Sequence, residues 1–151
     1  MIKSLKIITT ALFAALFVSS CEEQELPVVE YLDVNANNIS GTWELVEWNG
    51  SPLESGTYVY MDILRDERTF TLYQNVDSFH NVPHTVTGRY ALDTDPELGA
   101  IIRGTYDYDS GDWSHRYIIK DLTSTEMTWV AKDDAAYIQK YVRVDSIPVK
   151  E

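Results

Sequence analysis

The chain has 151 residues, of which 44% are hydrophobic and 24% are charged. These values fit one globular domain with short appendages, and they exclude a chain disordered throughout or one with several membrane spans. Twelve basic and twenty-four acidic residues give a net charge of −12, so the chain repels phosphate backbones and no nucleic acid partner is expected.

The first 20 residues have the pattern of a signal peptide. Lys3 and Lys6 precede the apolar run IITTALFAALFV, which is shorter than the roughly 20 residues that span a bilayer. The run ends in VSSC, and these four residues resemble the lipobox of bacterial lipoproteins. The resemblance implies that Cys21, the only cysteine, carries fatty acyl chains such as palmitate and anchors the mature chain in a membrane. The alternative is an ordinary secretory signal with a chance cysteine.

The residues that follow Cys21 are acidic. CEEQE resembles the export signal of some Gram-negative lipoproteins, which directs them to the outer face of the outer membrane. We therefore expect a lipid-anchored outer-membrane protein exposed at the cell surface, with the periplasmic face and a plain solvated tether as alternatives. Residues 21–38 lack a steady periodicity and contain Pro27, so they are predicted to form a flexible tether.

Residues 39–146 have the pattern of a β-barrel domain, and residues 147–151 form a C-terminal tail. Short runs rich in β-branched and aromatic residues alternate with turn residues. Eight strands joined by short links predict an all-β, up-and-down antiparallel barrel, since closure removes the exposed edges. The predicted strands are 42–49, 58–64, 69–74, 85–92, 100–108, 114–120, 126–132 and 137–144.

Alternation within the strands indicates which side chains share a face. Met127, Trp129 and Ala131 alternate regularly, as do the residues at 102, 104, 106 and 108. In the first strand Trp43 and Leu45 share one face, but Val46 and Trp48 take the other. This switch predicts either a β-bulge or a strand that passes from the barrel wall to an exposed lip.

The two ends of the domain carry a pair of residues that fits barrel closure. Gly41-Thr42-Trp43 resembles the G-x-W motif on the first strand of lipocalins, in which an arginine from the last strand lies over the tryptophan. Arg143 occupies the matching place. Closure brings first and last strands together, so a guanidinium can stack on the indole for about 0.5–2 kcal/mol. The resemblance covers residues 39–144 and implies a barrel that binds a small apolar or amphipathic ligand. The domain departs from typical lipocalins in being shorter and having no evident C-terminal helix.

Two clusters of potential metal ligands are interpreted as surface loops. His80 and His84 are separated by Pro83, so they cannot share a helical face as zinc ligands at that spacing do. The alternative is a metal site formed by both histidines and a nearby carboxylate. The segment DYDSGDW, residues 107–113, holds three aspartates but lacks the spacing and the terminal acid of an EF-hand, which favours a hairpin turn at Ser110 and Gly111 over a calcium site.

No catalytic centre is predicted, because no nucleophile elbow or comparable local pattern links the serines, histidines and aspartates. The expectation is therefore a protein that is not an enzyme and needs no cofactor or metal. The aromatic content is more informative: ten tyrosines and four tryptophans can line or fill an eight-stranded barrel. The residues expected to form the barrel wall or contact a ligand are Tyr58, Tyr60, Tyr106, Trp113, Tyr117 and Trp129.

Two functional hypotheses follow. In the first, the barrel binds a small apolar or amphipathic ligand, which requires an open interior. In the second, the barrel is filled and the protein is a non-catalytic accessory or interaction module that contacts a surface protein or a glycan. The volume inside the barrel distinguishes them.

Overall fold

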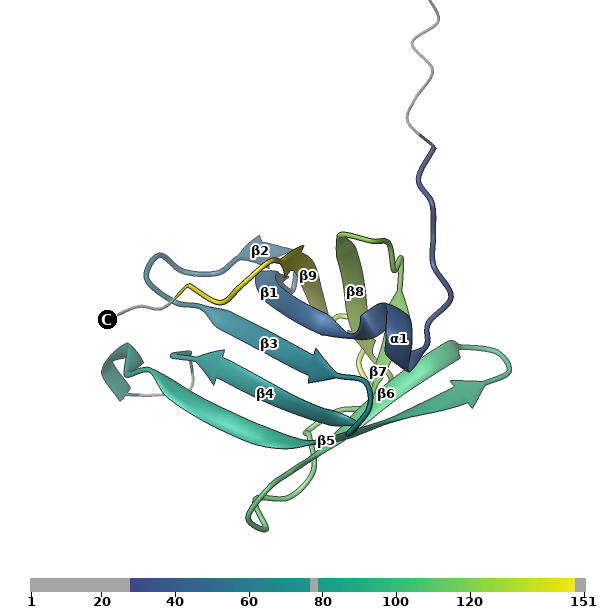
Figure 1. Cartoon of the computed structure of the whole chain (residues 1–151). Helices are drawn as coiled ribbons and strands as arrows, with labels where there is room; N and C mark the ends of the chain where they lie inside the picture. Colours follow the sequence, from purple (N-terminus) through teal and green to yellow (C-terminus); the bar gives the residue numbers. More distant parts are fainter. Residues whose placement is uncertain (1–27, 77–78, 149–151) are drawn as a thin grey trace, which may run out of the picture.

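The structure, a computed structural model, describes residues 28–76 and 79–148, so the signal peptide and Cys21 lie outside it. Its main feature is a closed antiparallel barrel (Figure 1). Each of the eight barrel strands pairs with the next barrel strand along the chain, and the first also pairs with the last. The predicted up-and-down barrel is thus confirmed. The barrel strands are β1 (Gly41–Trp48), β3 (Val59–Leu64), β4 (Thr69–Gln74), β5 (His84–Asp95), β6 (Gly99–Tyr106), β7 (Tyr117–Lys120), β8 (Glu126–Ala131) and β9 (Ile138–Val144).

Three short elements lie outside this set: the helix α1 (Ala36–Ile39), the strand β2 (Ser51–Pro52) and the 3₁₀ turn η1 (Phe79–Asn81). β2 pairs only with the end of β1. α1 leads directly into β1 (Figure 1), so we call that end of the barrel the α1 end and the opposite one the far end.

The segment between β6 and β7 differs from the prediction. β6 stops at Tyr106 and β7 begins at Tyr117, so the predicted strands 100–108 and 114–120 were too long. Tyr108 and Asp109 have φ angles of 61° and 56°, a left-handed conformation that ends a strand. Tyr108 is 96% exposed and does not share the inward face of Ile102 and Tyr106.

β1 contains the predicted bulge. Its register against β9 shifts between Leu45 and Glu47, which leaves Val46 as the extra residue. An extra residue exchanges the faces of every later side chain in a strand. Trp48 therefore packs against the interior cluster to which Trp43 and Leu45 also belong.

The end of the predicted tether is folded onto the barrel. Asn35 accepts a hydrogen bond from the backbone N–H of Asn38 at 2.9 Å, which caps α1, and Ile39 is fully buried. The backbone N–H of Leu32 also donates to the carbonyl of Leu122 at 2.8 Å. The structure thus differs from the prediction of a flexible segment up to residue 38, because this short stretch has both a capping residue and an apolar face.

Arg143 connects three parts of the chain at the α1 end. Its guanidinium carbon lies 4.1 Å from the centroid of the Trp43 ring. Its three nitrogens donate to the carbonyls of Asn38 (2.7 Å), Ser40 (2.5 Å) and Ser124 (2.9 Å). The N–H of Trp43 donates to the carbonyl of Ile39 at 2.9 Å. The last strand is thereby joined to the first strand, to α1 and to the loop before β8.

Gly41 is required for this arrangement. Its φ angle of 122° lies in a region that other residues rarely adopt, and a Cβ at this position would collide with Nη1 of Arg143. The glycine and the tryptophan of the G-x-W pattern thus serve the same contact, since one makes room for the guanidinium and the other provides the ring.

Replacing Arg143 with Ala should lower the free energy of unfolding by about 2–4 kcal/mol, because it removes the ring contact and leaves three carbonyls without their donor. Urea denaturation of a soluble fragment of residues 28–148 measures this change. Lys140→Ala, on the outer face of the same strand, is the matched control and should change stability by less than about 0.5 kcal/mol. An equally small effect of Arg143→Ala would show that the contact does not stabilise the closed barrel.

Candidate functional site

The half of the barrel next to α1 is packed solid. Trp43, Met61, Phe70, Ile102 and Met127 are each no more than 1% exposed. They come from five different strands, and their side chains meet in one cluster. A ligand site inside the barrel therefore has to lie toward the far end.

A cavity of about 240 Å³ lies there. The volume is below the roughly 300–1,000 Å³ of sites for drug-sized molecules, so the cavity fits a smaller ligand or one part of a larger one. The interior is thus filled next to α1 and open toward the far end, which lies between the open barrel and the filled barrel of the two hypotheses. The lining residues are Leu45, Trp48, Val59, Met61, Leu72, Gln74, Tyr106, Trp113, Ser114, Tyr117, Trp129, Tyr137, Gln139 and Tyr141.

Trp113 forms part of the cavity wall although it belongs to no strand. The chain between β6 and β7 folds back so that the backbone N–H of Trp113 donates to the carbonyl of Gly104 at 2.9 Å. The indole lies against Gly104, where any Cβ would collide with it. Its ring centroid is 4.9 Å from that of Phe70 and 5.6 Å from that of Trp129. The glycine in β6 therefore makes room for a ring supplied by the loop.

The cavity combines aromatic rings with a few polar groups. The hydroxyl of Tyr141 donates to Oε1 of Gln139 at 3.1 Å, and the side chain of Gln74 contacts Nε2 of His84 at 3.2 Å. The buried Nε1 of Trp113 has no hydrogen-bond partner among the described residues. A buried donor without an acceptor costs about 1–3 kcal/mol, so an acceptor on a bound molecule within reach of this atom would recover free energy.

The phenols in the cavity are strongly desolvated. Burial raises the pKa of Tyr117, and the neighbouring Tyr137 adds to the shift. Burial also raises the pKa of Tyr141 well above its usual value. Both groups therefore remain neutral donors over the physiological pH range.

The six aromatic residues singled out from the sequence divide into two sets. Tyr106, Trp113, Tyr117 and Trp129 line the cavity. Tyr58 and Tyr60 do not, because the alternation of β3 places Val59 and Met61 inside. The hydroxyl of Tyr60 instead donates to the Glu44 carboxylate at 3.1 Å, and Tyr58 stacks beside it with ring centroids 5.7 Å apart.

Sequence reasoning missed several lining residues. Gln139 and Tyr141 alternate with Arg143 along β9, so the period of two contained the signal that would have placed them inside. Trp48 was missed because the bulge reverses its face. Gln74 ends a strand whose alternation from Phe70 also points it inward.

The candidate metal ligands have other contacts. His80 is exposed, and the ring of His84 contacts Gln74 and the carbonyl of Val82. Asp107 accepts a hydrogen bond from Thr87 at 2.6 Å, and Asp112 accepts one from Thr105 at 2.9 Å. Within the part of the chain that the structure describes, no three potential ligands are grouped around a metal position.

Comparison with known families identifies the fold. A family model described as a lipocalin-like domain matches residues 39–129, more than half of the chain, so the protein belongs to the lipocalin-like domain family. Searches of curated proteins and of solved structures gave no match. The matched range stops before β9, so the family match does not cover Arg143, and its position beside Trp43 is seen in the structure. None of the helices in the described residues is long and apolar enough to cross a bilayer.

The raised pKa values of Tyr117 and Tyr141 predict alkaline unfolding. Because the folded state favours the neutral phenols, their contribution to stability is complete below the unfolded-state pKa of about 10 and is lost as the pH rises through the folded-state values. Absorbance at 295 nm should therefore show at least two phenols that ionise only together with the loss of circular dichroism. Tyr141→Phe should reduce that late step by about one phenol. Complete ionisation of all tyrosines before unfolding would contradict the prediction.

Proposed function

We propose that this lipocalin-like protein binds a small amphipathic ligand in the far-end cavity and is held at the outer membrane through lipidated Cys21. The observation that carries the binding proposal is the cavity itself, which is walled by aromatic rings; one of them is Trp113, whose buried indole N–H has no acceptor among the described residues. Apolar pockets with a few placed polar groups are how proteins usually bind small molecules.

The ligand has an aromatic or compact apolar body and at least one hydrogen-bond acceptor. Rings of Tyr117, Trp129 and Trp113 favour stacking or edge contacts with such a body. An acceptor satisfies the N–H of Trp113, while the amides of Gln74 and Gln139 discriminate among polar substituents. The proposed role is binding without catalysis, since the cavity residues include no nucleophile held by a base.

Membrane attachment rests on the sequence. Cys21 follows the lipobox-like residues and precedes acids that resemble a surface-export signal. A chain anchored by several acyl groups remains stably in the membrane. The folded domain, with its acidic net charge, gains little from anionic headgroups, so the acyl chains are the proposed attachment.

Two matched probes test the cavity. The fragment of residues 28–148 is titrated with p-cresol and with toluene, which differ by one hydroxyl, while the methyl resonance of Met61 in the cavity wall is followed by NMR. Both probes should bind saturably. Trp113→Phe keeps a ring but removes the unpaired N–H, so it should weaken p-cresol binding about fivefold or more and leave toluene within about twofold.

If neither probe binds saturably, the ligand-binding proposal is refuted. It would favour the second hypothesis, a non-catalytic interaction module for a surface protein or glycan, which the solid packing of the α1 half also fits. Equal losses for both probes in Trp113→Phe would show that the ring, and not its N–H, determines binding.

Cys21→Ser in the full chain tests the anchor. The variant should leave the membrane fraction of a Gram-negative host, because it cannot be acylated. Glu22→Gln combined with Glu23→Gln retains the thiol and serves as the control, which should stay in the membrane fraction. Detection of Cys21→Ser in the membrane at the same level as the natural chain would refute lipid anchoring.

A further inference from the structure

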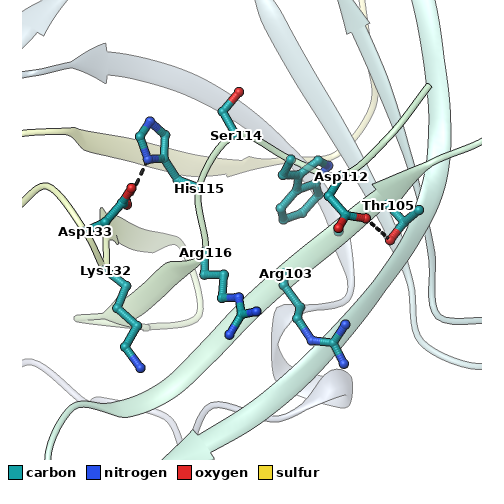
Figure 2. A pocket seen from close by; sticks show the side chains of 10 residues that line it. Arg103, Thr105, Asp112, Ser114, His115, Arg116, Lys132 and Asp133 are labelled. Carbon is teal, nitrogen blue, oxygen red and sulfur yellow. Dashed lines mark hydrogen bonds and ion pairs between the residues drawn. The ribbon is translucent and has the colours of Figure 1, made fainter.

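A second cavity lies on the outside of the barrel wall. Its volume is about 480 Å³, within the range of small-molecule sites. It is bounded by β6, by the end of the loop between β6 and β7, and by the residues that follow β8 (Figure 2). We call it the outer cleft. Trp113 and Ser114 line both the outer cleft and the barrel cavity, so the two sites share one wall.

Three cationic side chains meet at the outer cleft although the chain is strongly acidic. Arg103 lies in β6, Arg116 directly precedes β7, and Lys132 directly follows β8. Figure 2 shows the charged ends of all three on the same side of the cleft. Elements distant in sequence therefore bring like charges together, an arrangement that is unfavourable unless negative charge balances it.

Two of these cations form ion pairs with carboxylates that lie outside the cleft. Nε of Arg103 lies 2.9 Å from the Asp93 carboxylate, and Nζ of Lys132 lies 3.3 Å from that of Asp95. Both aspartates belong to β5 and neither lines the cleft. These ion pairs orient the two cations and leave the terminal nitrogens of Arg103 as further donors.

Arg116 is not balanced in this way. Among the described residues, no carboxylate or carbonyl accepts from its guanidinium, and its backbone carbonyl holds the N–H of Lys132 at 2.8 Å. The two acids that line the cleft are already engaged. Asp133 pairs with His115 at 2.8 Å, and Asp112 accepts from Thr105 at 2.9 Å. A hydrogen bond from a hydroxyl does not cancel the charge of Asp112, so the cleft has no positive net charge; what sets it apart is the guanidinium of Arg116, whose donors have no acceptor among the described residues.

We propose that the outer cleft binds the oxyanion of a small molecule, a carboxylate or a phosphate, with Arg116 as its central ligand. A guanidinium donates two parallel hydrogen bonds to such a group, and charge-assisted bonds of this kind are strong. Arg103 and Lys132 flank the anion. The hydroxyl of Ser114, at the other side of the cleft in Figure 2, is available to a neutral part of the ligand. This site lies outside the barrel and does not depend on the function proposed for the interior.

The test is a titration of the mature chain in a non-ionic detergent with two probes, inorganic phosphate and glucuronate. The side-chain N–H resonance of Arg116 is followed by NMR. It should shift saturably with at least one probe, and Arg116→Gln should weaken binding, measured by calorimetry, about tenfold or more. Tighter binding of glucuronate would identify a carboxylate on a larger molecule, and tighter binding of phosphate would identify a tetrahedral anion.

Arg65→Gln is the matched control. It removes the same charge from an exposed arginine in the turn between β3 and β4, which contributes nothing to the cleft. It should alter the affinity by less than about twofold, because exposed charges at a distance are screened. An equal loss in Arg65→Gln and Arg116→Gln would overturn the proposal in favour of general charge attraction, as would the absence of a saturable shift with either probe.

Independence from the barrel cavity is tested with Trp113→Phe, which replaces the indole of the shared wall by a smaller ring without an N–H. If this variant still binds phosphate or glucuronate but binds p-cresol more weakly, the anion is assigned to the outer cleft. Loss of anion binding in Trp113→Phe with full binding in Arg116→Gln would place the anion inside the barrel and refute the proposal.

Discussion

The guanidinium of Arg143 is the contact on which the closed barrel depends. It stacks on Trp43 and donates to carbonyls from α1, from the residue before β1 and from the loop before β8. Burial lowers the pKa of Arg143, which reflects the loss of water around its charge. The three carbonyls compensate for the part of that water that is lost, since removing a charge from water is costly unless hydrogen bonds replace it. Closure and the solid packing of the α1 half are therefore a single arrangement.

The wall of the far half of the barrel is held by different contacts. There the side chain of Asn49, directly after β1, accepts a hydrogen bond from the N–H of Ile138 in β9 at 2.8 Å, and the wall is completed by a ring from outside the sheet. Gly104 leaves a gap that Trp113 fills, much as Gly88 accommodates the ring of Phe70. One face of the Trp113 segment then borders the interior and the other borders the outer cleft. Both candidate sites thus depend on a loop that several hydrogen bonds hold, among them those from Trp113 to Gly104 and from Thr105 to Asp112.

Most of the fold could be predicted from the sequence because strands are recognised from short stretches of the chain. Alternation over six to eight residues located most strands, and the Gly41–Trp43 and Arg143 patterns indicated which strands meet. α1 was missed because four residues are too few to show a helical period. The sites were harder, because they depend on tertiary placement. Nothing in the loop sequence shows that Trp113 turns back onto Gly104, and Arg103, Arg116 and Lys132 become neighbours only once the barrel is closed.

The order of the strands has a kinetic consequence. Among the eight barrel strands, all pairings except one join strands that are consecutive in the barrel, so they are antiparallel connections that form with little loss of chain entropy. The exception is the seam between β1 and β9, where Trp43 pairs with a residue roughly one hundred positions later. That seam has the largest loop-closure cost of any single pairing, so we expect it to form late in folding. Until the seam forms, β1 and β9 each have an unpaired edge. A strand of a neighbouring molecule can pair with that edge, so the open barrel is prone to aggregation.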